Sequence, residues 1–232
     1  MLKAYKFRIY PNKSQEEIII AHFGACRFVY NWALEQKIKE YQANKHHISR
    51  FELQTILVKE VKPANEWLKT TNSQSLLASL INLESAFTKF FREKKGFPKF
   101  KSKKNPVQSF QIPQHYVVDF EKGNVKLPKI GKVKTSFSRK FDGICKTATV
   151  SRSTTGKYYI SILVEDGKEL PVKEPFTVDS TIGVDVGIKD FVILSNGVKI
   201  DNPKYLKNSL QKLKVLSKKL SKKVKGSNNW KK

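Results

Sequence analysis

Apolar and polar side chains alternate along residues 3–10, which places Tyr5, Phe7 and Ile9 on one face of an extended chain. A period of two predicts a β-strand. The Pro-Asn-Lys-Ser sequence of residues 11–14 ends this alternation. Asn12 or Ser14 in that sequence can cap a helix.

Three stretches with apolar residues at helical spacing follow, within residues 18–32, 51–61 and 76–91. They predict three helices, and the third has the clearest stripe. That stripe is more typical of core packing than of a ligand-binding surface. Pro63 is expected to end the second helix or to begin the loop before the third.

A basic connector, residues 93–104, separates the helices from a region with a different period. Turn signals alternate with short apolar-polar runs, which predicts five or six strands of a small barrel or sandwich. The strand at residues 3–10 has no partner nearby in the sequence. We therefore expect it to pair into this barrel, with the three helices as an insertion. The expected strands lie near residues 110–112, 116–118, 125–127, 132–137, 147–151 and 158–164.

Beyond an expected linker at Pro171 to Pro175, a second unit begins near residue 179. Residues 182–187 predict a buried strand, and Asn196-Gly197 is a strong hairpin signal. Residues 203–232 keep leucines at helical spacing among eleven lysines, which predicts a basic amphipathic helix that Gly226 ends or interrupts.

The net charge of the chain limits the class of binding partner that we expect. The 232 residues carry 45 Lys plus Arg against 20 Asp plus Glu, a formal net charge of +25. Self-repulsion of this size is relieved by a polyanion, which favours nucleic acid over an anionic membrane surface. No apolar run approaches the length of a transmembrane helix and no secretion signal opens the chain, so we expect a cytoplasmic protein. Cys26 and Cys145 are interpreted as two buried thiols, rather than as a disulfide or a metal site.

Asp185 is the sharpest candidate for chemistry. An Asp within a buried strand is costly unless it is paired or bound to a metal ion. Gly183 and Gly187 leave room around it. The alternative is a turn or cap residue, which is how we interpret Asp190.

Several spaced motifs, in order, make the chain resemble the TnpB (OrfB) family of transposon-encoded RNA-guided nucleases, which is similar to the type V CRISPR effectors. The matching stretches are KAYKFRIYPNKSQE, CRFVYNWAL, SLINLESAFTKFFREKKGFPKFKSKK, VKLPKIGKVK, IGVDVGIKDFVILSNG and KLSKKLSKKVKGSNN. The resemblance covers the whole length of the chain.

The resemblance implies a multi-domain α+β fold. A split wedge-type, OB-like β-barrel would comprise residues 1–12 and 97–172. A helical recognition insertion, helix-turn-helix-like, would comprise residues 13–96. The N-terminal part of a RuvC-like (ribonuclease H-like) nuclease domain, with a basic helix, would comprise residues 179–232. The implied partners are a guide RNA and double-stranded DNA in a prokaryotic, nucleoid-associated setting, without a membrane.

The resemblance also makes Asp185 the first RuvC acid, a Mg²⁺ ligand. The family site adds a Glu, a second Asp and a four-cysteine zinc ribbon, yet beyond Asp201 this sequence has no acid and no cysteine. Mg²⁺ is thus expected for the complete family site but not for this chain, where one carboxylate cannot hold two ions. We expect no zinc site and a C-terminally truncated, catalytically incomplete nuclease.

Basic and aromatic residues are the candidates for contacts with nucleic acid, although each lysine could equally be a solvated surface residue. Gln74, at the start of the third helix, could pair with an adenine edge or could simply be a polar helix-start residue. Two other functions remain open: a nuclease-dead RNA-guided repressor and a plain sequence-specific DNA-binding protein. The candidate binding residues are Lys6, Arg8, Tyr10, Arg27, Gln74, Arg92, Lys94, Lys95, Phe97, Lys99, Phe100, Lys101, Lys103 and Lys104.

Overall fold

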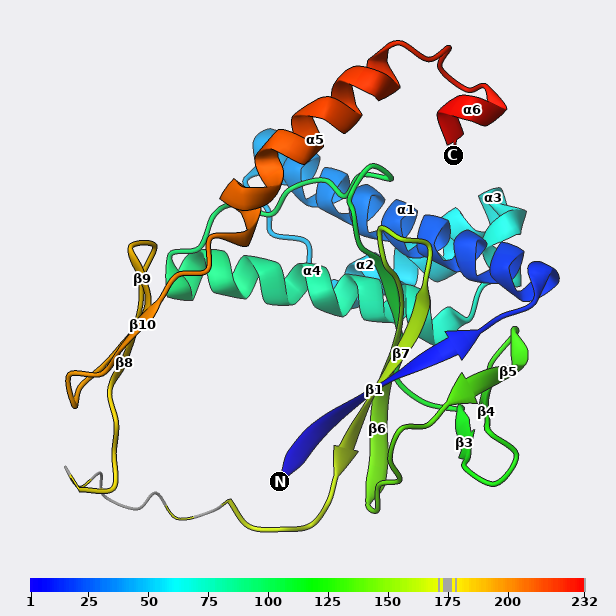
Figure 1. Cartoon of the computed structure of the whole chain (residues 1–232). Coiled ribbons are helices and arrows are strands. Elements are labelled where there is room, and N and C mark those ends of the chain that lie inside the picture. Colours follow the sequence, from blue (N-terminus) through cyan, green and yellow to red (C-terminus); the bar gives the residue numbers. More distant parts are fainter. Residues whose placement is uncertain (171, 173–176, 178, 232) are drawn as a thin grey trace. The chain divides into compact units, whose positions relative to one another are not determined.

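The structure of the chain is a computed structural model, and it describes residues 1–170, 172, 177 and 179–231. These residues fall into two compact units, with unit 1 ending at Leu170 and unit 2 following it (Figure 1). Of the expected linker at residues 171–175, only Val172 lies within the described residues.

Unit 1 is built on a seven-stranded antiparallel sheet with the order β2-β6-β7-β1-β5-β4-β3. The first strand, β1, pairs with β7 on one side and with β5 on the other, which confirms that the N-terminal strand joins strands far along the chain. The strands are β1 (Leu2–Tyr10), β2 (Gln108–Ile112), β3 (Val117–Asp119), β4 (Asn124–Leu127), β5 (Gly131–Ser136), β6 (Ile144–Arg152) and β7 (Tyr158–Glu165).

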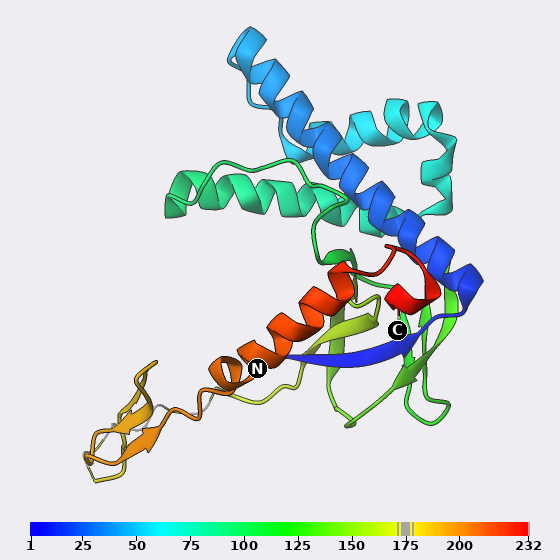
Figure 2. The same ribbon diagram turned by 45° about the horizontal axis from the view of Figure 1, so that its top comes forward.

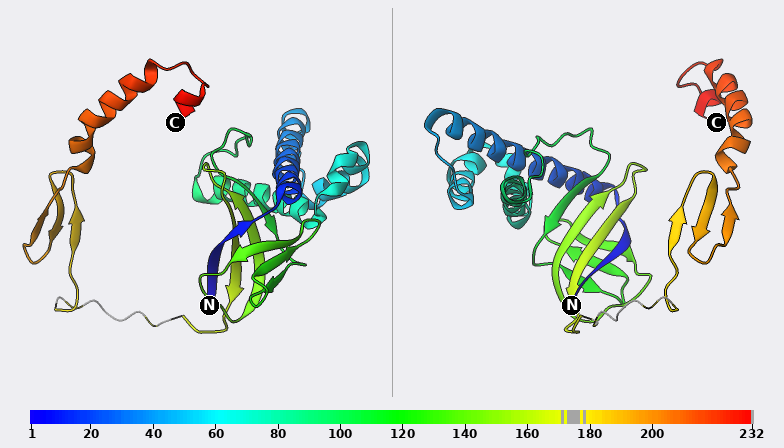
Figure 3. Two further views of the ribbon diagram at one scale, coloured as in Figure 1. Left: turned by 45° about the vertical axis from the view of Figure 1, so that its right-hand side comes forward. Right: turned by 90° about the vertical axis from the view of Figure 1, so that its left-hand side faces the viewer.

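The sheet curls strongly (Figure 3, right). Along the described strands, the ladder begins at β2 and ends at β3 without a pairing between these two edges. Closure into the expected barrel is therefore not confirmed. Alternation along each strand sends one set of side chains inward, as in β7, where every second residue from Tyr158 to Val164 is buried.

The helical insertion lies between β1 and β2, as expected. Its long helices α1 (Lys13–Asn44) and α4 (Ser73–Glu93) cross one another and pack against the β2 edge of the sheet (Figure 2). Side chains from both helices and from the sheet form one hydrophobic core. Between the long helices lie α2 (Arg50–Ile56), the π-helical turn η1 (Leu57–Val61), α3 (Lys62–Ala64) and the 3-10 turn η2 (Glu66–Thr70).

Pro63 does not end the second helix, so that expectation was wrong. The chain remains helical through Ala64, with Pro63 in the first turn of α3. A proline is tolerated there because the first turn of a helix needs no N–H donor. The preceding π-helical turn closes with the Lys62 N–H donating to the Leu57 carbonyl.

Unit 2 holds a three-stranded antiparallel sheet of order β10-β9-β8, formed by β8 (Val184–Val186), β9 (Asp190–Leu194) and β10 (Lys199–Asp201). Asn196-Gly197 forms the turn between β9 and β10, as the sequence predicts, with Gly197 at φ 87°. The basic helix α5 (Tyr205–Ser221) ends earlier than expected. Gly226, at φ 88°, lies in the turn before the short helix α6 (Asn228–Lys231).

Candidate nucleic-acid interface

Three predicted binding residues share the outer face of the unit 1 sheet. Lys6, Arg8 and Tyr10 alternate along β1 with the buried Phe7 and Ile9, so their side chains point away from the core. The alternation of the sequence predicts this arrangement and the structure confirms it.

Tyr159 of β7 joins these residues and completes what we call the basic face, defined as Lys6, Arg8, Tyr10 and Tyr159. The Arg8 guanidinium lies 5.2 Å from the Tyr10 ring centroid and 5.5 Å from that of Tyr159. The Lys6 ammonium lies 4.8 Å from the Tyr159 centroid. These cation–π contacts hold the two positive charges beside exposed aromatic surface.

The Arg8 Nε atom is buried and has no hydrogen-bond partner among the described residues. A guanidinium in this position can still donate from its terminal nitrogens to a phosphate. Ser161 lies opposite Lys6, and Lys134 lies opposite Tyr10, on the neighbouring strands. The basic face therefore offers cations, aromatic rings and hydroxyl groups on one surface.

Sequence reasoning missed Tyr159. Its outward position follows from the alternation of β7, because its neighbours Tyr158 and Ile160 are buried. Its place beside Arg8 depends on the register between β1 and β7, in which Arg8 and Tyr159 are partners. No local pattern in the sequence specifies that register.

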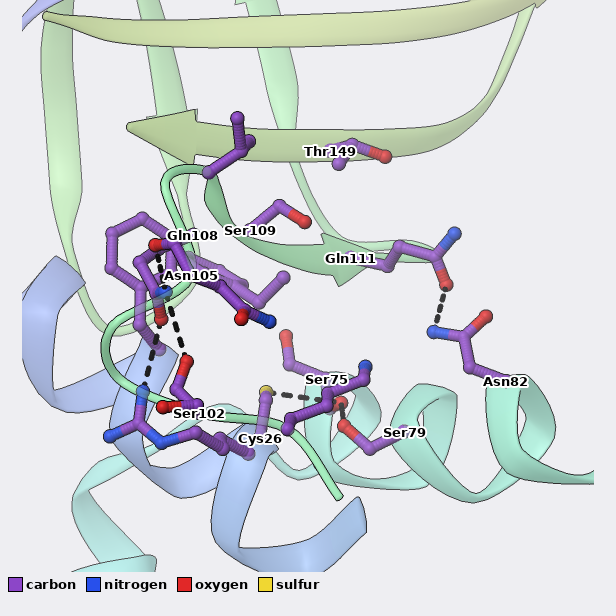
Figure 4. A pocket seen from close by; sticks show the side chains of 15 residues that line it. Cys26, Ser75, Ser79, Asn82, Ser102, Asn105, Gln108, Ser109, Gln111 and Thr149 are labelled. Atoms are coloured by element: carbon purple, nitrogen blue, oxygen red, sulfur yellow. Dashed lines mark hydrogen bonds between the residues drawn. The ribbon is translucent and has the colours of Figure 1, made fainter. Parts of the chain in front are cut away.

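A second group of polar residues lines the polar cleft, a hollow of about 220 Å³ between α1, α4 and β2 (Figure 4). It brings together two predicted binding residues, Arg27 and Lys101, which lie far apart in the sequence. None of its lining residues is an Asp or Glu. The lining residues are Phe23, Cys26, Arg27, Ser75, Ser79, Asn82, Lys101, Ser102, Asn105, Val107, Gln108, Ser109, Phe110, Gln111 and Thr149.

Gln108 organises one wall of the polar cleft. Its Oε1 accepts from Arg27 Nη1 at 3.0 Å, and its Nε2 donates to the Asn105 carbonyl at 2.9 Å. Asn31 fixes the adjoining loop by two hydrogen bonds with the Lys101 backbone, at 2.8 and 2.9 Å. These contacts hold the basic loop against α1.

The opposite wall is tied to β2. Asn82 Nδ2 of α4 donates to Gln111 Oε1 at 3.1 Å, as the dashed line in Figure 4 shows. Ser79 is buried and donates to the Ser75 carbonyl at 3.2 Å. Amide and hydroxyl groups of this kind can donate to or accept from the edge of a base.

Electrostatics in the cleft favour an anion or a neutral polar group. Lys101 is exposed as a residue, but its ammonium lies 4.1 Å from the Tyr30 ring centroid, and desolvation there lowers its pKa. Burial raises the pKa of the Cys26 thiol to about 11, so Cys26 stays protonated and donates to the Ser75 carbonyl at 3.4 Å. Cys26 is thus the buried thiol that the sequence predicts, whereas Cys145 is exposed.

The remaining predicted residues do not join these two groups. Gln74 is half-buried in the first turn of α4, where its backbone N–H donates to the capping Asn72 side chain at 3.3 Å. Phe97 packs edge-on against Phe87 and Phe90. Phe100 is 57% exposed. The exposed cations along and beyond the end of α4 are Arg92, Lys94, Lys95, Lys99, Lys103 and Lys104.

Asp185 lies in β8, but the expectation that this strand is buried was wrong, because all three residues of β8 are exposed. Its register partner is Ile193, which in turn faces Lys199. Side chains at paired positions share a face, so Asp185, Ile193 and Lys199 lie on one side of the small sheet. Val184 and Val186 lie on the other side.

Asp190 and Asp201 are strand residues, which corrects the interpretation of Asp190 as a turn or cap residue. Asp190 begins β9, Asp201 ends β10, and a bulge in the ladder makes them register partners. The hairpin thus extends further than its sequence suggests.

Within the part of the chain that the structure describes, no three His, Cys, Asp or Glu residues group as metal ligands. Asp185 would supply a single carboxylate to Mg²⁺. Two-metal phosphodiester chemistry needs several ligands that bridge and flank both ions. The described residues of unit 2 therefore do not by themselves supply enough ligands for two metal ions.

Comparison with known proteins identifies two matching regions. Residues 1–46 match the family HTH_OrfB_IS605, described as "Helix-turn-helix domain". Residues 161–232 match the family OrfB_IS605, described as "Probable transposase". In this structure, residues 1–46 form strand β1 and the single long helix α1 rather than two helices joined by a turn.

Two relatives match along nearly the whole chain. A protein of Escherichia coli (strain K12) named "Putative RNA-guided DNA endonuclease InsQ" is 38% identical over 233 residues, covering 100% of this chain and 56% of that protein. A protein of Streptomyces pristinaespiralis named "Putative RNA-guided DNA endonuclease" is 30% identical, covering 99% of this chain and 57% of that protein. The chain therefore spans little more than half the length of these relatives.

Among solved structures, a Cas12f1-sgRNA-target DNA complex matches 94% of this chain and 62% of that chain, with 15% identity and a TM-score of 0.38. This likeness is too small to support a conclusion about the present chain. No helix among the described residues has the length and apolar character needed to cross a membrane.

Proposed function

Because the chain belongs to the OrfB (TnpB) family of transposon-encoded proteins, we propose that it binds a guide RNA and a target DNA duplex through unit 1. The observation that carries this proposal is the polar cleft, where Arg27 and Lys101 meet a wall of amides and hydroxyls without any acid. A cleft with this lining attracts phosphates and can also form hydrogen bonds with base edges.

We assign duplex contacts to the polar cleft and the adjoining start of α4. Arg27 and Lys101 would contact phosphates, while Asn82 and Gln111 would face base edges. Gln74, in the first turn of the same helix, would reach an adenine in the major groove. Phosphate contacts set the position of the protein, and base contacts set its sequence preference.

We assign RNA contacts to the basic face. Tyr10 is 49% exposed and can stack on an unpaired base, and Arg8 and Lys6 can pair with the flanking phosphates. RNA recognition commonly combines aromatic stacking with cations in this way. The hydroxyl of Ser161, opposite Lys6, adds a possible partner for a ribose 2′-hydroxyl.

Cleavage is a separate question. We propose that Asp185 is the first acidic ligand of a nuclease centre, and that a polypeptide of residues 1–232 binds nucleic acid without cutting it. Mg²⁺, when bound by a complete set of ligands, would neutralise phosphate charge and activate water. Asp185 would contribute one ligand to such a set. Asp190 lies on the neighbouring strand β9 and Asp201 on the opposite edge strand β10 of the same small sheet.

The test is binding of RNA and of duplex DNA by the wild type and by charge-matched variants. Arg27→Gln and Lys101→Gln should each weaken duplex binding several-fold and reduce the salt slope by about one. Lys39→Gln is the control, since it removes one charge from α1 at an exposed side chain that pairs with Glu35 at 2.6 Å. Fluorescence anisotropy over a salt series measures both quantities.

Three results would contradict the proposal. The first is a wild-type protein that, after purification at low salt, has the ultraviolet absorbance ratio of protein without nucleic acid and binds no added RNA. The second is an equal loss in all three variants, which would indicate that net charge alone drives binding. The third is an affinity for duplex DNA that is the same with and without RNA, which would favour a plain DNA-binding protein.

A further inference from the structure

A second hollow of unit 1 lies at the C-terminal ends of α1 and α4 and takes no part in the contacts proposed above. We call it the aromatic groove, formed by Ile38, Tyr41, Phe87, Phe90, Phe91 and Phe97. Lys37, Gln42, His46, His47 and Ile48 complete its lining, and its volume is about 450 Å³. It shares no lining residue with the polar cleft.

The aromatic rings in the groove hold one another in place. Phe97 lies edge-on to Phe87 at a centroid distance of 5.5 Å and edge-on to Phe90 at 5.3 Å. Phe91 stacks on Phe87 at 6.2 Å. Despite these contacts Phe91 remains 67% exposed and Tyr41 58% exposed. Rigid rings with open surface are suited to accept a further flat, apolar ligand.

A buried cation lies at the base of the groove. Lys37 is only 7% exposed, and its ammonium lies 5.5 Å from the Phe87 ring centroid. It donates to the Ile48 carbonyl and lies 3.5 Å from His47 Nε2. Desolvation lowers the pKa of Lys37, while the charges of Glu84 and Glu52 oppose that shift. Lys37 thus places a cationic group beside the aromatic rings of the groove.

The segments that border the groove are strongly basic. Residues 89–99, which include Phe90, Phe91 and Phe97 of the groove, contain Glu93 as their one acid. A ligand held here therefore lies within a positive field that favours a polyanion. The cations of this segment are Lys89, Arg92, Lys94, Lys95 and Lys99.

We propose that the aromatic groove binds an unpaired base of single-stranded nucleic acid, with the base against Phe91 and Tyr41 and the flanking phosphates on the cations beyond α4. Stacking accounts for the exposed rings, and the basic border accounts for the phosphates. Lys37 provides a donor toward a base carbonyl. This inference rests on the proposed function in one respect, that the chain binds nucleic acid.

The charge of the border distinguishes this ligand from the alternatives. A second copy of the chain would bring the same excess of cations against the same segments, which opposes association. A paired base cannot enter, because both of its faces are covered within the duplex. An unpaired strand satisfies both constraints.

The experiment measures binding of an oligouridylate of about 12 nucleotides, long enough to cover one stacking site and its flanks. Phe91→Ala should weaken binding about tenfold, because stacking of one base commonly contributes on that order. Phe91→Trp should restore it. Neither change alters charge, so the dependence on salt should stay the same. Binding of a fully paired duplex should be unaffected.

Phe51→Ala is the matched control, since Phe51 is a comparably exposed phenylalanine, at 68%, that lies outside the aromatic groove. An oligouridylate carrying 4-thiouridine should cross-link to Tyr41, Phe91 or Phe97, which peptide mass spectrometry can locate. Loss of binding in Phe91→Ala alone, together with these cross-links, supports the proposal.

Two outcomes overturn it. If the wild type binds the oligouridylate and Phe91→Ala binds it equally well, the groove is not a base site, although the proposed function stands. If light scattering shows a wild-type dimer that Phe91→Ala dissociates, the groove is a self-association surface. A wild type that binds neither RNA nor DNA would instead contradict the proposed function itself.

Discussion

At the residue scale, His22 joins the two long helices through a fixed tautomer. Its Nδ1 lies 2.8 Å from the Ile18 carbonyl, which requires a proton on that nitrogen. Its Nε2 accepts from the Asn72 N–H at 3.1 Å, which requires a lone pair there. Asn72 is the N-cap of α4, so a neutral His22 holds α1 against the start of the next long helix.

Acid should weaken this link. Burial lowers the pKa of His22 from its usual value of 6.5, and the hydrogen bond to Ile18 only partly opposes that shift. As the pH falls, His22 is therefore protonated near pH 6.5 in the unfolded chain but only at a lower pH in the folded chain. The contribution of neutral His22 to the free energy of unfolding is fully present above that pH and is lost as the pH falls toward the lower pKa of the folded state.

We expect His22→Gln to flatten the dependence of unfolding free energy on pH on the acid side of about pH 7, because a glutamine does not titrate. Loss of one hydrogen bond should lower stability at neutral pH by about 1 kcal/mol. Urea unfolding at several pH values measures both effects. His115→Asn is the control at an exposed, left-handed position (φ 66°) that asparagine tolerates. An unchanged slope in His22→Gln would assign the acid sensitivity elsewhere.

At the element scale, a capping box sets the start of α1. Asn12 accepts from the Gln15 N–H at 2.9 Å, and the Gln15 side chain accepts from the Asn12 N–H at 3.1 Å. Gln15 also donates to the Lys132 carbonyl at 2.8 Å, which ties the helix start to β5. The sequence predicted a cap at Asn12 or Ser14, and the structure selects Asn12.

Asn12→Ala should destabilise unit 1 by about 1 kcal/mol, within the usual range for removal of an N-cap side chain. The midpoint of chemical unfolding measures this change. Asn44→Ala is the control near the other end of α1, where the side chain forms one exposed hydrogen bond with Glu40 at 2.8 Å. A comparable loss in both variants would mean that the cap itself contributes little.

The elements of unit 2 show that an amphipathic pattern does not determine whether its apolar face is buried. The stripe of α5 was correctly predicted to be helical, but Leu206, Leu210 and Leu213 are all exposed by about half or more. The β8 valines are exposed as well. A pattern specifies which face of an element is apolar, whereas its burial requires a partner surface.

At the scale of the whole molecule, we expect binding of nucleic acid without cleavage of DNA. A polypeptide of residues 1–232 should show no cleavage of guide-matched plasmid in Mg²⁺ or Mn²⁺, since Asp185 offers a single carboxylate where two metal ions need several ligands. Asp185→Ala should leave the affinity for RNA and duplex DNA unchanged, because Asp185 lies outside unit 1. A plasmid assay with matched and unmatched targets measures cleavage. Guide-dependent cleavage that disappears in Asp185→Ala would show this polypeptide to be an active nuclease.

The candidate site was only partly predictable. The sequence placed Lys6, Arg8 and Tyr10 on one face because strand alternation is a local property. It did not place Tyr159 beside Arg8 or Arg27 beside Lys101, because these pairs depend on a strand register and on a helix lying against a distant loop. Phe97 was a candidate for contact with nucleic acid, and the structure packs it against Phe87 and Phe90 in the aromatic groove while leaving it 45% exposed.

The sequence by itself determined the features that arise between near neighbours. These include the periods of strands and helices, the start of a helix near residues 12–14, the turn at Asn196-Gly197 and the excess of positive charge. Only the tertiary structure decided the insertion of β1 between β5 and β7, the acid-free cleft and the aromatic groove. Local patterns act over a few residues through backbone sterics and short hydrogen bonds, whereas each of these surfaces joins segments whose proximity is fixed by burial of the shared core.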